Sequence, residues 1–195
     1  SGVTEMNSKA HFNPKSKKQI ITFIIMLIVS IIIVVASAFL SKTITEKEKQ
    51  TANLDSFNVN ITTPIAVKDN DFNVTGVENA FDEKGNLVGY VIKTKTTGYN
   101  AEVPIETATT VTKDGKYVVG IDILKQEETE YLGVRIQTDD FKNQFKSRKL
   151  PVASSSTIEK GSKVDVIAKS TLSSDAVITA VNDAGEYAKT YLVKK

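Results

Sequence analysis

The chain lacks cysteine altogether, and it has a single histidine, His11, among 195 residues. Structural zinc sites, iron–sulfur clusters, thiol nucleophiles and histidine-based triads all depend on these two residue types. The sequence therefore excludes most of the usual metal and nucleophile chemistry. The missing cysteines do not decide the compartment, because a bacterial protein on either side of a membrane can lack them.

An excess of charge of one sign is also missing. The 25 lysines and arginines nearly balance the 23 acidic residues, giving a formal net charge of +2 and a pI of about 8.6. A nucleic-acid-binding domain usually gathers Lys and Arg on one face. We therefore expect no nucleic-acid partner. The length suits one domain together with an anchor.

One long apolar run is present, from Ile20 to Leu40, and it contains no charged residue. A helix needs about 20 apolar residues to span a membrane. The alternative is a cleaved signal peptide, whose apolar stretch is usually ~7–15 residues long and ends at a small-residue cleavage site. This run is longer, and its small residues 36–38 lie inside it. The sequence therefore predicts a retained transmembrane helix.

The charges around this run suggest an orientation. Lys15, Lys17 and Lys18 precede it without an acidic residue, whereas the three lysines that follow it are interleaved with glutamates. Basic residues near a helix end favour the cytoplasmic side. We expect a cytoplasmic tail over residues 1–19, a transmembrane helix over 20–40, a stalk over 41–53 and an extracytoplasmic domain over 54–195.

Turn signals in the downstream region predict β-hairpins. Asp114-Gly115 separates the β-branched runs 106–112 and 117–126, and the turn residues 81–86 precede the apolar run 87–94. An Asp-Gly pair between such runs is a strong hairpin signal. A further strand is expected around Ile158, Val164, Val166 and Ile167.

Two segments show helical spacing. Phe141 and Phe145 lie four residues apart within the short segment 140–145, and so fall on one side of a helix. Near the C-terminus, Ser173 or Ser174 is expected to cap a helix, with Asp175 in its first turn. That helix has apolar residues at positions 176, 177, 180, 181, 184, 187, 188 and 191. The predicted fold class is α+β, an antiparallel sheet with packed helices.

Three segments carry a family resemblance. They are Gly98-Tyr99 with the hairpin after it; Glu128-Thr129-Glu130-Tyr131-Leu132-Gly133 followed by Phe141-Lys142-Asn143-Gln144-Phe145; and Asp165 to Ser174. In this order, and behind one apolar helix, they resemble the FMN-binding domain of the G subunit of the Rnf electron-transport complex. The related C subunit of the sodium-pumping NADH:quinone reductase shares this domain.

The chain departs from the family pattern at two places. Glu130 and Tyr131 stand where the family has Pro-Gly, and Ala168-Lys169-Ser170 stands where it has Ser-Gly-Ala. Both departures remove a glycine. Glycine permits a positive φ and a close approach of the backbone to phosphate, so these positions bear on the shape of the site.

The resemblance implies that Thr171 carries FMN covalently through a phosphoester bond. The residues it implies around the cofactor are Tyr99, Glu128, Thr129, Leu132, Gly133, Lys169, Ser170, Ser173 and Ser174. Lys169 could place a cation near the phosphate. From the residues alone, Thr171 and Ser173 could equally be simple N-capping residues.

The resemblance also implies a function and partners. The chain would be an electron-transfer subunit of an ion-translocating ferredoxin:NAD oxidoreductase in the cell membrane, with no catalytic acid or base of its own. Its partners would be the membrane subunits of an Rnf-type complex and a flavin transferase. Two alternatives remain: a stand-alone anchored flavoprotein for extracellular electron transfer, or a flavin-free anchored scaffold or adhesion domain.

Overall fold

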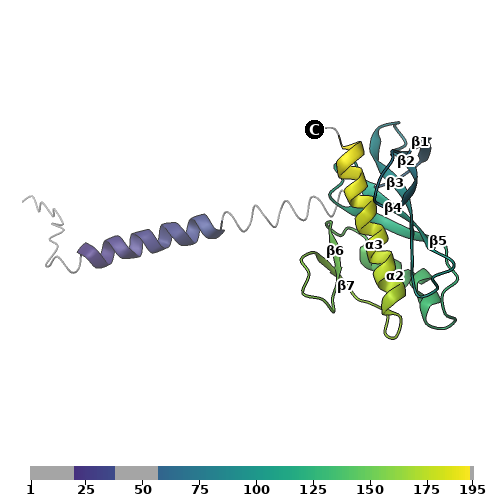
Figure 1. Ribbon diagram of the computed structural model, residues 1–195. Coiled ribbons are helices and arrows are strands. Elements are labelled where there is room, and N and C mark those ends of the chain that lie inside the picture. Colours follow the sequence, from purple (N-terminus) through teal and green to yellow (C-terminus); the bar gives the residue numbers. More distant parts are fainter. Residues whose placement is uncertain (1–19, 38–56, 194–195) are drawn as a thin grey trace, which may run out of the picture. The chain divides into compact units, whose positions relative to one another are not determined.

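The computed structural model describes residues 20–37 and 57–193 (Figure 1). These belong to two units, which meet in sequence between Gln50 and Thr51 and are described separately. The expected tail (1–19), the expected stalk (41–53) and the last three residues of the expected transmembrane run lie outside the described residues.

The first unit contains the apolar helix Ile20–Ser37, with a mean hydropathy of 3.1. Its 18 residues span about 27 Å. The hydroxyls of Ser30 and Ser37 donate to the carbonyls of Leu27 and Val34, at 3.1 and 2.9 Å, so neither leaves an unpaired polar group on an apolar helix. Within the described residues, this is the one helix long and apolar enough to cross a membrane.

The second unit is built on a five-stranded antiparallel sheet in which sequential strands are neighbours. Along β4, residues 105, 107, 109 and 111 are buried and alternate with half-exposed residues, so one face of the sheet meets the core. The strands are β1 (Ile61–Ile65), β2 (Val74–Phe81), β3 (Leu87–Thr96), β4 (Ile105–Thr112) and β5 (Val118–Lys125).

The long helix α3 (Thr171–Tyr187) covers that face and packs mainly against β3 and β4 (Figure 1). Its apolar stripe, which includes Val177, Val181 and Ala184, is fully buried. The predicted C-terminal helix is therefore confirmed. The chain continues through one π-helical turn, η3 (Ala188–Leu192).

The predicted cap of this helix is wrong. The N-cap is Ser170, and its side chain makes no capping hydrogen bond. Ser173 and Ser174 lie inside the first turn, and Asp175 lies beyond it. The helix begins earlier than expected because the Ser174 hydroxyl donates back to the carbonyl of Ser170, at 2.9 Å, which holds the extra turn.

A winding segment joins β5 to α3 through η1 (Gly133–Gln137), α2 (Asp139–Lys142), η2 (Asn143–Phe145), β6 (Val152–Ser154) and β7 (Ser162–Val164). Phe141 and Phe145 are buried, with ring centroids 5.4 Å apart in an edge-to-face arrangement. The predicted short helix with both rings on one side is confirmed, although its last turn is a 3₁₀ helix.

The strand expected from Ile158 to Ile167 is largely wrong. Only Ser162–Val164 is extended, as β7, and it pairs in parallel with β6. Ile158 is fully exposed in the loop before it. The strand stops at Asp165 because the Gln144 side chain bonds its backbone. The Gln144 amide oxygen accepts a hydrogen bond from the Asp165 N–H, at 2.8 Å, and the amide nitrogen donates to the Asp165 carbonyl, at 3.3 Å. A side-chain amide thus replaces the next ladder bonds.

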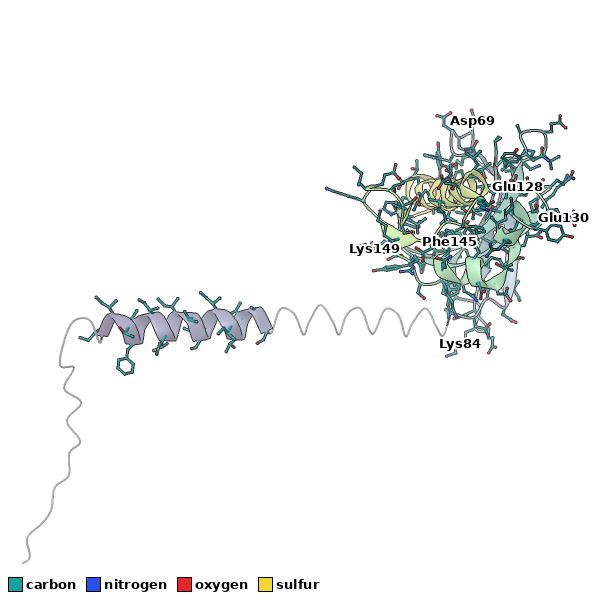
Figure 2. All side chains as sticks on the ribbon, turned by 90° about the horizontal axis from the view of Figure 1, so that it is seen from below. Asp69, Lys84, Glu128, Glu130, Phe145 and Lys149 are labelled. Atoms are coloured by element: carbon teal, nitrogen blue, oxygen red, sulfur yellow. The ribbon has the colours of Figure 1, made fainter. Side chains whose placement is uncertain are left out.

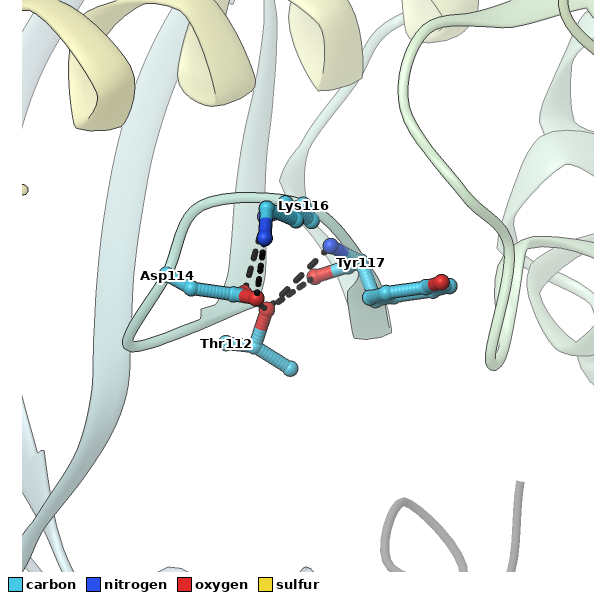
Figure 3. A network of polar contacts seen from close by, with 4 residues as sticks. All are labelled: Thr112, Asp114, Lys116 and Tyr117. Carbon is cyan, nitrogen blue, oxygen red and sulfur yellow. Dashed lines mark hydrogen bonds and ion pairs between the residues drawn. The ribbon is translucent and has the colours of Figure 1, made fainter. Parts of the chain in front are cut away.

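The β4–β5 hairpin turns as its Asp-Gly signal predicts, and Gly115 adopts a φ of +66°. The Thr112 hydroxyl donates to the Asp114 carboxylate, at 2.6 Å, and accepts the Tyr117 backbone N–H, at 3.2 Å (Figure 3). Burial alone would raise the pKa of Asp114. The hydrogen bonds from Thr112 and the Lys116 backbone, with the Lys116 charge, outweigh burial and lower that pKa.

Candidate functional site

Glu128, three residues after β5 ends, lies at the centre of the candidate site. Its side chain is only 6% exposed. The carboxylate accepts the backbone N–H groups of Tyr99 and Asn100, at 3.0 and 3.2 Å, and the hydroxyl of Ser173, at 2.5 Å. One buried carboxylate therefore joins all three segments of the sequence motif. Figure 2 shows Glu128 beside α3, whereas Glu130 projects outward.

Two glycines make room for this carboxylate. A Cβ atom on Gly98 would overlap Oε1 of Glu128, and one on Gly133 would lie 2.5 Å from the Glu128 Cβ and 3.0 Å from the Ser173 Oγ. Neither glycine has a positive φ. They are therefore required for close approach and not for an unusual backbone conformation.

Three serines at the start of α3 are buried and bonded to the protein itself. The Ser170 hydroxyl donates to Ser173 at 3.1 Å, and the Ser173 hydroxyl donates to Glu128. The Ser174 hydroxyl accepts the Ile167 N–H at 3.0 Å as well as donating to Ser170. These serines fix the turn that leads into α3. Their hydroxyl hydrogens all have acceptors within the protein.

Thr171 is the first residue of α3, and its side chain is exposed. The first backbone N–H groups of a helix have no acceptor within the helix, and no side chain caps them here. The first turn of α3 also contains no acidic residue. Among the described residues, neither a capping side chain nor a first-turn carboxylate competes with an anion at the start of this helix.

Lys169 and Tyr131, at the two positions where the family has glycine, both adopt left-handed backbone conformations. Their φ angles are +64° and +63°. Both side chains are exposed, that of Tyr131 by 80%. The loop shapes that glycine would favour are therefore kept, with a cation and a phenol added at the surface.

The remaining expected residues also lie around Glu128. The Thr129 carbonyl accepts the N–H groups of Leu132 and Val134, at 3.2 and 3.3 Å, which closes the turn from Glu128 to Gly133. The Tyr99 ring is 67% exposed, while its backbone is fixed by Glu128. The structure thus brings every expected site residue to one region.

Sequence reasoning missed two residues as parts of this region. Asn100 donates from its side-chain amide to the Glu127 carbonyl at 2.8 Å, which adds a second link between the loops. Gln144 holds the backbone of Asp165, and so connects the second motif to the third. Its place between two buried phenylalanines in the Phe-x-x-Gln-Phe motif was the signal for its role.

Asp175 follows the first turn of α3, and its pKa is raised. The larger cause is partial burial, and the smaller is the negative charge of Glu159. The Asp175 carboxyl is therefore less readily ionised than a free aspartate side chain. The nearest opposing charge in the sequence is that of Lys169.

Residues 98–186 match the family of the FMN-binding domain. The Glu128 cluster and nearly all of α3 lie within this match, which makes this part of the chain similar to FMN-binding domains and supports FMN as its cofactor. The solved structure of the C subunit of the Na⁺-translocating NADH-quinone reductase from Parabacteroides distasonis has a similar fold. It aligns with a TM-score of 0.54 and 17% identity, over 79% of this chain and 98% of that one.

Two curated relatives are closer in sequence. The G subunit of the ion-translocating oxidoreductase complex of Methanosarcina acetivorans is 37% identical over 106 residues, 54% of each chain. The G subunit of the Na⁺-translocating ferredoxin:NAD⁺ oxidoreductase complex of Acetobacterium woodii is 35% identical over 102 residues, 50% of this chain and 48% of the relative. The chain spans about half the length of these relatives. The predicted resemblance to the G subunit of such complexes is confirmed.

Proposed function

We propose that this chain carries FMN on Thr171 and acts as the electron-transfer subunit of a membrane-bound, ion-translocating ferredoxin:NAD oxidoreductase of the Rnf type. The observation that carries the proposal is the position of Thr171. It is the exposed first residue of an uncapped helix, inside a matched FMN-binding domain and next to the Glu128 network. The names of the two curated relatives supply the class of complex.

The start of α3 suits a phosphate for electrostatic reasons. The partial positive charge of a helix N-terminus and its unpaired N–H groups favour an anion. An exposed Lys169 two residues before Thr171 adds a cation. A phosphoester at the Thr171 hydroxyl would place its charged oxygens among these groups, so the residues present fit the phosphate end of FMN.

The other residues around Glu128 would receive the rest of the cofactor. Tyr99 and Tyr131 are exposed aromatic side chains on two loops that the Glu128 cluster holds in place. Leu132, which directly follows Tyr131, is half-buried and apolar. Such surfaces suit a flat aromatic ring. FMN, once bound, supplies the one-electron and two-electron chemistry, and the chain supplies binding and orientation.

Membrane anchoring fits the apolar helix Ile20–Ser37 and the complexes named for the relatives. In the proposed orientation the tail is cytoplasmic and the FMN domain faces the outside. Covalent attachment has a physical purpose there, because a loosely bound cofactor would be lost to the medium. The helix and one face of the domain would contact the other membrane subunits, and a flavin transferase would modify Thr171.

The proposal is tested by purifying the tagged chain from its native membranes and adding reduced ferredoxin. We expect polytopic membrane subunits to co-purify, and ferredoxin to bleach the flavin absorbance. Thr171→Ala should abolish this signal. The matched control is Thr179→Ala, which removes another exposed threonine from the same helix.

The same preparation separates the alternatives. A flavin signal without accompanying subunits would identify a stand-alone anchored flavoprotein. A colourless wild-type protein would contradict the flavoprotein proposal and favour a scaffold or adhesion role.

A further inference from the structure

Glu128 has little capacity left for a cofactor. An ionised carboxylate only accepts hydrogen bonds, and this one already accepts from Tyr99, Asn100 and Ser173. The backbone N–H of Glu128 is itself bonded to the Gln126 side chain, at 2.6 Å. The residue is buried, and Gly98 and Gly133 lie directly against its side chain.

The groups that Glu128 holds are those next to the proposed cofactor contacts. The N–H of Tyr99 belongs to a residue with an exposed ring, and Ser173 lies two residues after Thr171 in the first turn of α3. Ser173 also accepts from Ser170, the N-cap of α3. The carboxylate therefore connects the Tyr99 loop to the helix start.

We propose that Glu128 is a positioning residue, which acts through Ser173 and the Tyr99–Asn100 backbone and does not itself bind FMN. It fixes the helix start so that the Thr171 hydroxyl is presented to the flavin transferase, and it fixes the loop that carries Tyr99. This inference rests on the proposed function, since it gives Glu128 its role in loading FMN.

The first test needs no flavin. In the apo protein, Glu128→Gln keeps the size of the side chain but adds an NH₂ group, which cannot accept the bonds that one carboxylate oxygen now accepts. We expect amide hydrogen exchange at Tyr99 and Asn100 to become at least about tenfold faster. The control is Glu130→Gln, an exposed glutamate two residues away. Unchanged exchange at both amides in Glu128→Gln would overturn the proposal.

The second test measures loading. When the chain is expressed with a flavin transferase, Glu128→Gln and Ser173→Ala should each lower FMN incorporation at least about tenfold. The double variant should lose no more than the stronger single variant, because both changes break the same connection. Losses that multiply in the double variant would contradict action through Ser173. Ser173→Ala also keeps the test valid if Glu128→Gln folds poorly.

A third measurement distinguishes positioning from a general loss of stability. In the fraction that does carry FMN, Glu128→Gln removes a buried negative charge from the cofactor's surroundings, so the flavin reduction potential should become more positive. Ser173→Ala changes no charge and should leave the potential near that of the wild type. An unchanged potential in Glu128→Gln would place the carboxylate too far from the flavin to position its contacts. If the wild type takes up no FMN, the proposed function fails, while the exchange test still decides the role of Glu128 in the loop.

Discussion

Lys169 and Tyr131, two residues near the site, adopt left-handed backbone conformations that lower the stability of the folded domain. A side chain with a Cβ atom in the left-handed region is destabilised by roughly 1–2 kcal/mol, and both residues lie there. Neither side chain is buried, so core packing does not compensate for this cost. The backbone shape at these positions is therefore set by the surrounding loop and not by the local preference of the residue.

Lys169→Gly should therefore stabilise the domain. Relief of the left-handed strain exceeds the extra chain entropy of glycine, which costs about 0.5–1 kcal/mol, and leaves a net gain of about 0.5–1 kcal/mol. The shift of the denaturant midpoint measures it. The control is Lys146→Gly, at an exposed lysine with a φ of −58°, which should lose stability. A loss in both variants would contradict the strain argument.

Sequence reasoning found most residues of the site but not the roles of all. The motif order placed Glu128, Gly133 and Ser173 in one region, and the structure joins them. It could not show that the serine hydroxyls bond to protein groups, because that depends on how α3 meets the Glu128 loop. The missing glycines suggested altered loops, yet Tyr131 and Lys169 keep positive φ angles, since tertiary contacts override local preference.

At the scale of elements, the β4–β5 hairpin is held by a side-chain network at its turn. Thr112→Val replaces the hydroxyl that bonds Asp114 and Tyr117 with a methyl group of similar size. We expect a loss of about 1 kcal/mol at neutral pH, because Asp114 is partly exposed and solvent weakens each bond. Thr110→Val, two residues earlier on the same strand and outside this network, should have a smaller effect.

The size of this effect should depend on pH. The folded protein lowers the pKa of Asp114 below its ordinary value of 3.8. A lowered pKa contributes stability that is present above 3.8 and is lost as the pH falls through the folded value. The difference in unfolding free energy between wild type and Thr112→Val should therefore shrink between about pH 7 and about pH 2. An equal difference at both pH values would show that Asp114 is not involved.

The elements that the sequence predicted well are those with strong local signals. The Asp-Gly turn, the Phe141–Phe145 pair and the apolar stripe of α3 each report local geometry, and all three are confirmed. The strand from Ile158 to Ile167 failed because a distant side chain, Gln144, ends it at Asp165. No pattern inside that segment encodes this contact.

At the scale of the whole molecule, the proposal places the FMN domain on the outer side of the membrane. Because the chain has no cysteine, Ile158→Cys introduces a single thiol at a fully exposed position. We expect a membrane-impermeant maleimide to label this variant in intact cells, and the cysteine-free parent to remain unlabelled. Labelling only after the cells are permeabilised would place the domain in the cytoplasm.

The most direct measurement is the intact mass of the chain from its native membrane, together with in-gel fluorescence under ultraviolet light. The account predicts an FMN-sized mass increment and fluorescence in the wild type. Thr171→Ala should show neither, and Thr179→Ala should show both. An unmodified, non-fluorescent wild type, or a Thr171→Ala variant that keeps the increment, would contradict the assignment of FMN to this helix start.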